Sequence, residues 1–225
     1  MFIVGAQINI IDVPTPQVSG KSKIYFQQEV HIGNRDIISG TIINWGIGKN
    51  FEAGISLCQL TFHTRPHTSL LELDPQHPEE TPRLMGNLRK TFVVTTWMMI
   101  GVGTQTGMNI TRQMNDEKLV NFSYLSTRYS IPSSQTFFIL GGYYANRPYA
   151  GEGNSFGAMA GFEWELVRDR LSLITDYLMG NNDLSVINMG IEWPFWRHWQ
   201  LDLAYQIPSP SSNNVQALVI QLGKK

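Results

Sequence analysis

Apolar and polar residues alternate one by one along most of this chain, and this two-residue period constrains its fold more than any other feature. The clearest stretch, 199–207, has a large apolar side chain at every second position and mostly polar residues between them. Stretches 24–32, 156–166 and 187–193 show the same pattern. Successive side chains of a β-strand point to opposite faces, so each stretch predicts a strand with one apolar and one polar side. No stretch has a convincing helical period, and we expect an all-β chain.

Turn-forming residues divide the chain into twelve predicted strands. Clusters such as Gly33-Asn34-Arg35-Asp36 interrupt the alternation with residues that favour turns. The fourth and fifth strands are separated at Gly101 and Gly103, where no strong turn signal is present. The predicted strands are 22–32, 36–47, 50–62, 88–100, 103–112, 118–131, 135–146, 154–167, 170–179, 184–194, 196–207 and 214–223.

The connections between these strands fall into two alternating classes. Tight turns include 48–50, 167–169 and 194–197, whereas the other class includes the long 63–87 segment. Barrels of the bacterial outer membrane have short periplasmic turns, longer external loops and an even number of strands. We therefore predict a closed antiparallel up-and-down transmembrane β-barrel of about 12 strands over residues 21–225. Residues 1–20 are predicted to form an N-terminal extension or a plug in the lumen.

Composition favours a membrane barrel over a soluble one. Only 16% of the residues are charged, against about 25% in soluble domains, yet the mean hydropathy is only −0.14. The polar strand faces contain Gly, Ser, Asn and Gln but little Lys. Aromatic residues lie near the predicted turns, as the interfacial girdles of such barrels require. The expected membrane-interface aromatics are Trp45, Trp164, Trp193, Trp196, Trp199 and Tyr205.

Several other classes of protein are disfavoured. No window reaches the ~18 apolar residues of a transmembrane helix, and the first ten residues, MFIVGAQINI, contain no recognisable signal peptide. The net charge of −1 gives no indication of a nucleic-acid partner. Cys58 is the only cysteine, which excludes an intramolecular disulfide and a thiolate metal cluster.

Six segments between position 12 and the end of the chain carry a resemblance to known proteins. They are DVPTPQVSGKSKIYFQQEV (12–30), NWGIGKNFEAGISL (44–57), GVGTQTGMN (101–109), GGYYANRPYAGEGNSFGAMAGFEWEL (141–166), DYLMGNNDLSVINMGIEW (176–193) and WQLDLAYQIPSPSSNN (199–214). In these segments the chain resembles a family of uncharacterised bacterial outer-membrane β-barrels, which are similar to the porin-like family named after the meta pathway of phenol degradation. The resemblance implies an outer-membrane barrel with a channel function and no catalytic residue.

Acidic residues on the polar strand faces are the strongest candidates for a functional site. Glu163, Asp176, Glu192 and Asp202 fall on four successive predicted strands, each near a tight turn, and Glu29 lies on the polar face of the first strand. As lumen-lining residues of a narrow pore they would attract cations and repel anions. The alternative is that these carboxylates pair with lumen Arg and Lys residues and fill the barrel with hydrogen bonds.

Other clusters of chemically capable residues are weaker candidates. Three histidines and two acids of the long loop could bind a divalent transition metal, but their spacing matches no tight template and a solvated loop is favoured. A Ser–His hydrolase at His67 and Ser69 lacks an orienting third group. The tryptophans near Arg197 could form an aromatic platform for a sugar or base, although an interfacial belt is favoured. The loop residues are His63, His67, Glu72, Asp74 and His77.

These observations predict a non-enzymatic barrel in the bacterial outer membrane, either a porin-like passive channel or a structural barrel. We expect the lipid bilayer and small solutes, cations among them, as its partners, and no cofactor, metal or nucleic acid. A soluble β-barrel or sandwich that binds an apolar ligand also has alternating strands and stays an alternative. A barrel lipid hydrolase is a third.

Overall fold

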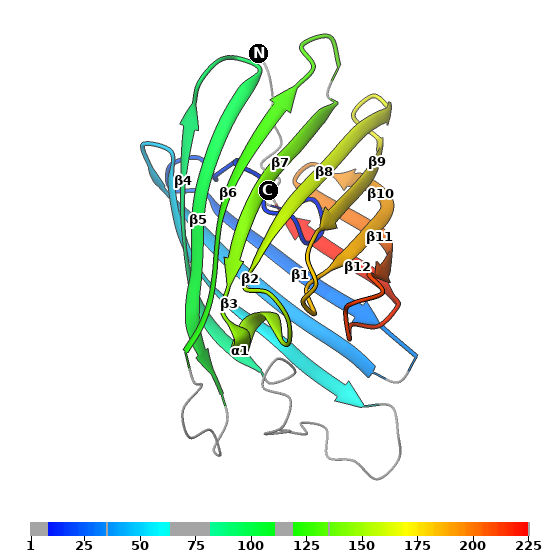
Figure 1. The fold of residues 1–225 in the computed structure, drawn as a ribbon. Coiled ribbons are helices and arrows are strands. Elements are labelled where there is room, and N and C mark those ends of the chain that lie inside the picture. The colour runs from blue at the N-terminus through cyan, green and yellow to red at the C-terminus, as the bar shows by residue number, and fades with distance from the viewer. Residues whose placement is uncertain (1–8, 35, 64–81, 111–118, 135, 225) are drawn as a thin grey trace.

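The structure, a computed structural model, describes residues 9–34, 36–63, 82–110, 119–134 and 136–224, which form twelve strands and one short helix (Figure 1). In chain order the elements are β1 (Ile24–Ile32), β2 (Asp36–Gly48), β3 (Phe51–His63), β4 (Arg83–Val93), β5 (Met98–Asn109), β6 (Leu119–Ser130), β7 (Phe137–Ala145), α1 (Arg147–Ala150), β8 (Phe156–Val167), β9 (Leu171–Leu178), β10 (Val186–Trp196), β11 (Trp199–Pro208) and β12 (Ala217–Lys224). Within these residues, no helix is long and apolar enough to cross a membrane.

The strands form a single closed barrel in which every neighbour is antiparallel. Each strand pairs with the next in the chain, and β12 returns to pair with β1. At the seam, Val30 of β1 lies opposite Ser39 of β2 on one side and Ile220 of β12 on the other. Closure leaves none of the twelve described strands with an unpaired edge. The predicted twelve-stranded, up-and-down architecture is confirmed.

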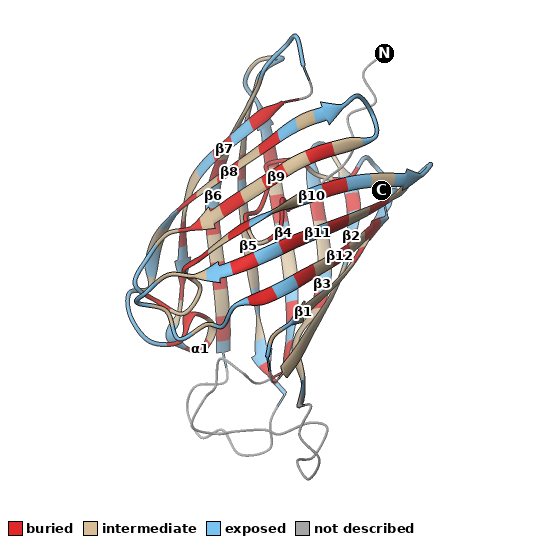
Figure 2. Cartoon of the chain, turned by 90° about the vertical axis from the view of Figure 1, so that its right-hand side faces the viewer, coloured by how far each residue is buried: buried red, intermediate tan, exposed pale blue. Residues whose placement is uncertain are grey.

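The two sides of the barrel wall differ as the alternation predicts. Along β11, Gln200, Asp202 and Gln206 are buried on the inside, whereas Leu203 and Tyr205 are exposed on the outside. Figure 2 shows the same alternation as red and pale blue bands along the strands. Along β11, polar groups therefore face the lumen and large apolar groups cover the outer surface. On the inner side of β6 to β9 the buried residues instead include an apolar cluster, with Phe122, Phe137 and Ile174 among its members.

The predicted boundary between the fourth and fifth strands is wrong. The turn lies at residues 94–97, where the backbone N–H of Val94 donates to the carbonyl oxygen of Met98. Gly101 and Gly103 instead lie inside β5. Because the turn lies earlier than predicted, β4 also begins earlier, at Arg83.

The two glycines are in β5 because the lumen is crowded beside them, and not because the chain turns there. A Cβ atom on Gly101 would lie 2.7 Å from Cα of Pro16, and one on Gly103 would lie 2.4 Å from the Tyr124 ring. A glycine in a strand often marks such a close approach rather than a turn.

The connections at the two ends of the barrel differ in length. At one end, β2–β3, β8–β9 and β10–β11 are joined by two or three residues, and Gly48, Lys49, Asn50 and Asp169 adopt positive φ angles there. At the other end lie α1 and the longer connections, such as 179–185 and 209–216. The three predicted tight turns therefore share one end, whereas the β1–β2 connection at the other end, 33–35, is also short and departs from the alternation.

Residues 9–20 lie inside the barrel and connect to β1 at the short-turn end. Ile10, Ile11, Val13 and Thr15 are completely or almost completely buried. The segment runs between the walls, where Figure 1 shows it in dark blue. The segment fills part of the lumen. The space that it leaves open is therefore the candidate region for function.

Candidate functional site

A large cavity occupies the lumen at the end with the longer connections. Its volume is about 940 Å³, and its wall includes Glu29, Ser39, Arg83 and Tyr149. Residues 9–14 contribute Asn9, Ile11, Asp12 and Pro14 to its lining. The N-terminal segment therefore forms one boundary of this cavity.

The strongest polar contact of the segment is with Asp176 of β9. One carboxylate oxygen of Asp176 accepts the backbone N–H groups of Ile11, Asp12 and Val13 at 2.9, 2.8 and 2.9 Å. Its other oxygen accepts the side-chain amide of Asn188 at 2.8 Å, and the same amide also donates to Asp12 at 2.7 Å. Hydrogen bonds to an ionised acceptor are stronger than neutral ones, so this cluster is an anchor.

The opposite part of the segment is held by β3 and β4. The Glu52 carboxylate accepts the backbone N–H of Ser19 at 2.7 Å. The Arg89 guanidinium donates to the carbonyl oxygen of Gln17 at 3.1 Å. Glu52 and Arg89 are also direct register partners across the two strands. The segment is thus fixed to two different parts of the wall.

Two inward-facing glycines create the space that the segment occupies. A Cβ atom on Gly46 of β2 would lie only 2.1 Å from the carbonyl oxygen of Gly20, and the one on Gly101 would meet the backbone of Pro16. Beside Gly101, the Thr91 hydroxyl donates to the Pro16 carbonyl oxygen. The wall is therefore shaped to accept the backbone of the segment.

An apolar cluster completes the contact between the segment and the wall. The side chains of Ile10, Ile11 and Val13 pack in one cluster with Ile139 of β7 and Ile174 of β9. Burying an aliphatic side chain contributes about 1.5–3 kcal/mol. Phe137 and Tyr143 of β7 and Leu178 of β9 extend this apolar cluster along the inner surface of the wall.

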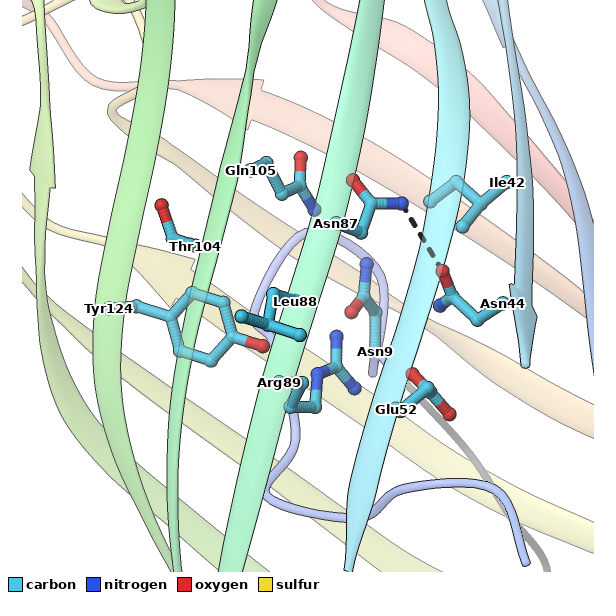
Figure 3. A pocket seen from close by; sticks show the side chains of 10 residues that line it. All are labelled: Asn9, Ile42, Asn44, Glu52, Asn87, Leu88, Arg89, Thr104, Gln105 and Tyr124. Atoms are coloured by element: carbon cyan, nitrogen blue, oxygen red, sulfur yellow. Dashed lines mark hydrogen bonds between the residues drawn. The ribbon is translucent and has the colours of Figure 1, made fainter. Parts of the chain in front are cut away.

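The wall formed by β2 to β6 is polar where it faces Asn9. Figure 3 shows the side chains there. The side-chain amide of Asn87 donates to the side-chain oxygen Oδ1 of Asn44 at 3.2 Å. The Arg89 guanidinium lies 5.7 Å from the centroid of the Tyr124 ring. This side of the lumen therefore combines amides, a cation and an aromatic ring.

The five predicted lumen acids all lie at inward-facing positions, four of them on the adjacent strands β8 to β11 and Glu29 on β1. Glu163, Asp176, Glu192 and Asp202 are buried, and Glu192 lies directly opposite Asp202 in the register of β10 and β11. Glu29 is the member of the set that lines the large cavity. Their effect on permeating ions stays a prediction.

The buried acids have neighbours that reduce the free-energy cost of placing a carboxylate inside the barrel. Ser172 donates to Glu163 at 3.3 Å, and the Gln200 amide donates to both oxygens of Asp202. The Arg128 guanidinium lies 3.7 Å from the ring centroid of Phe137, the register partner of Glu163. Such contacts are what the alternative of a hydrogen-bonded, filled lumen requires.

The predicted interface aromatics lie on the outer surface. Trp45, Trp164, Trp193, Trp196 and Tyr205 are exposed, and Trp199 is half-buried under the Lys224 amine. The five tryptophans lie near the short-turn end of their strands, whereas Tyr205 lies toward the other end of β11. Their role at a membrane interface stays a prediction.

One cluster was missed by the sequence reasoning. Asp12, Glu29 and His31 each place one potential ligand atom within 4.8 Å of the others, and the His31 Nε2 atom lies 2.5 Å from Glu29 Oε1. Desolvation, with the carboxylates of Glu29 and Asp176 nearby, raises the pKa of Asp12 from 3.8 to about 7. The two-residue spacing of Glu29 and His31 placed them on one face, but no pattern indicated that Asp12 would join them.

The metal and hydrolase candidates of the 63–87 segment have no described side chains. His67, Ser69, Glu72, Asp74 and His77 lie outside the described residues. The side chain of His63, at the end of β3, is not described either.

Two solved porin structures are similar to this chain in fold. One is the KdgM porin in complex with disordered oligogalacturonate, and the other is the KdgM porin alone. Each has a TM-score of 0.58, 10% sequence identity, and coverage of 90% of this chain and 98% of the other. At this identity the likeness shows a common fold, the twelve-stranded closed barrel.

No protein-family model and no curated protein matches the sequence. Membership of the porin-like family named after the phenol-degradation pathway is therefore not shown.

Proposed function

We propose that this chain is a barrel of the bacterial outer membrane that acts as a porin-like passive channel for small solutes. The observation that carries the proposal is the contrast between the two sides of the wall. Large apolar side chains such as Leu88, Leu140 and Phe156 are exposed on the outside, around a lumen with a cavity of about 940 Å³ that is lined by charged as well as apolar residues. Soluble monomers rarely expose apolar surface on this scale, whereas lipid covers it in a membrane.

The tryptophan positions support the same proposal and suggest an orientation. Trp45, Trp164, Trp193 and Trp196 are exposed near the short-turn end, where a lipid–water interface favours amphipathic rings. Outer-membrane barrels have short turns on the periplasmic side. The large cavity would then open toward the outside of the cell. A soluble barrel that binds an apolar ligand inside would not need this outer surface.

The charges around the cavity favour cationic or neutral solutes over acidic ones. Among the described residues, the carboxylates that line the cavity outnumber its guanidinium groups, Arg83 and Arg147. The KdgM porin has been seen with oligogalacturonate, a chain of sugar acids. The present cavity would repel such a chain, so the proposed solute differs. The lining carboxylates are Asp12, Glu29, Asp36, Glu152 and Asp183.

We further propose that residues 9–20 act as a plug that narrows the pore. The segment is buried in the lumen and is hydrogen-bonded to residues of β3, β4 and β9. A plug held on two sides would restrict permeation to small solutes.

Single-channel recording of the full chain in a planar bilayer tests the channel proposal. We expect discrete openings of small conductance with a preference for cations. Folded, inserted barrels, identified by heat-modifiable migration on a gel, that give no conductance would overturn the channel. Protein that stays monodisperse without detergent would overturn the membrane assignment.

A further inference from the structure

A group of three potential metal ligands lies where the N-terminal segment meets β1. Glu29 and His31 are two residues apart on β1, so both side chains point into the lumen. Asp12 reaches them from the segment, and the three ligand atoms all lie within 4.8 Å of one another. One imidazole and two carboxylates that converge in this way make a donor set that divalent transition metals accept.

The carboxylates already have the supporting hydrogen bonds that a metal site needs. The Asn188 amide donates to Asp12 at 2.7 Å, and the Gln27 amide donates to Oε2 of Glu29 at 3.2 Å. The remaining Glu29 oxygen, Oε1, faces Nε2 of His31. Supporting donors of this kind orient metal ligands and strengthen binding.

The residues and the space around this group allow a cation to enter and favour its binding. All three residues line the large cavity, so an ion can enter and can keep water in its open coordination positions. The Asp176 carboxylate is close by, bonded to the backbone of Asp12. A divalent ion among these three carboxylates would stabilise their ionised forms and displace protons from them.

From this geometry we infer that Asp12, Glu29 and His31 form a binding site for a divalent transition-metal ion, with Zn²⁺ as the best fit. The imidazole and the small number of protein ligands disfavour Ca²⁺ and Mg²⁺, which take oxygen ligands. The ion would link residues 9–20 to β1 and would take the place of the proton between His31 and Glu29. The site does not depend on the proposed channel function, since binding is measured without transport.

The test is calorimetric titration of Zn²⁺ into the full chain in detergent, after removal of metals with a chelator. We expect one ion per chain, and a loss of at least about 100-fold in affinity in D12N, E29Q and H31N, because even supporting residues are worth 10–100-fold. Asn188→Ala should weaken binding by about 10-fold or more. Heat-modifiable migration identifies the variants that retain a folded barrel.

Two controls separate this site from others. His67→Asn combined with His77→Asn removes loop imidazoles, and His198→Asn removes one in the β10–β11 turn; both variants should bind as the natural chain does. Co²⁺ should give a visible absorption spectrum that H31N loses. Zn²⁺ binding that persists in the D12N/E29Q/H31N variant would overturn the site. Binding lost in H31N but retained in D12N would overturn the link between the segment and β1.

Discussion

Gly101 of β5 packs directly against Pro16 of the N-terminal segment, with the position of a Cβ atom on Gly101 only 2.7 Å from Cα of Pro16. The neighbouring Thr91 hydroxyl donates to the carbonyl oxygen of Pro16. The glycine thus provides space and the threonine a hydrogen bond at one point of the wall. A contact between backbone and backbone cannot be relieved by a change of rotamer, so this point is sensitive to added volume.

Substitution of this glycine should loosen the segment while leaving the strand intact. Gly101→Val adds a β-branched side chain that strands favour but that overlaps Pro16, and overpacking costs about 1–3 kcal/mol. We expect faster hydrogen exchange in residues 10–19 and a larger single-channel conductance. Gly86→Val is the matched control, because a Cβ atom there meets nothing closer than the Thr106 oxygen at 3.7 Å. Equal exchange and conductance in both variants would argue against the plug.

Asp176 should contribute more to holding the segment than any other single polar residue described at this contact. Asp176→Ala removes the acceptor of three backbone N–H groups, and a hydrogen bond to a charged group is worth about 1.5–3 kcal/mol. Exchange of the Ile11, Asp12 and Val13 amides, measured by mass spectrometry or NMR, should accelerate about tenfold or more. Asp183→Ala is the matched control, because the Asp183 carboxylate also accepts backbone N–H groups, those of Glu152 and Asn213, which lie outside the segment. Protection that is unchanged in Asp176→Ala would show that the apolar contacts alone hold the segment.

A charge on the outer surface distinguishes a membrane barrel from a soluble one. Leu140 is 57% exposed in the middle of β7. Arg at the bilayer midplane costs about 2–4 kcal/mol in such barrels, falling to about 0–1 kcal/mol near the interfaces. Leu140→Arg should therefore lower the free energy of unfolding in lipid vesicles by about 2–4 kcal/mol, and Leu218→Arg, at the start of β12, by much less. Similar small effects at both positions would favour the soluble alternative.

The strands could be predicted from the sequence because the apolar and polar faces of each strand are visible in the alternation of its own residues. Gln200 and Asp202 are inside and Tyr205 is outside, as their positions in the alternation require. The β4–β5 turn was misplaced because Gly101 resembles a turn residue when its partner, Pro16, is far away in the sequence. The same reason hid the approach of Asp12 to Glu29: irregular segments have no period from which their contacts can be predicted.

Ion selectivity should depend on where each lumen acid lies. Glu29 lines the large cavity, whereas Glu163 is buried beside Ser172. A cation 4 Å from a carboxylate in water gains about 1 kcal/mol, which corresponds to a several-fold change in relative permeability. Glu29→Gln should therefore reduce the cation-to-anion permeability ratio several-fold, and Glu163→Gln should reduce it less. Reversal potentials in a KCl gradient, with a chelator present to remove bound metal, measure both ratios. A larger effect of Glu163→Gln would mean that ions pass along the buried acids of β8 to β11 and not through the cavity.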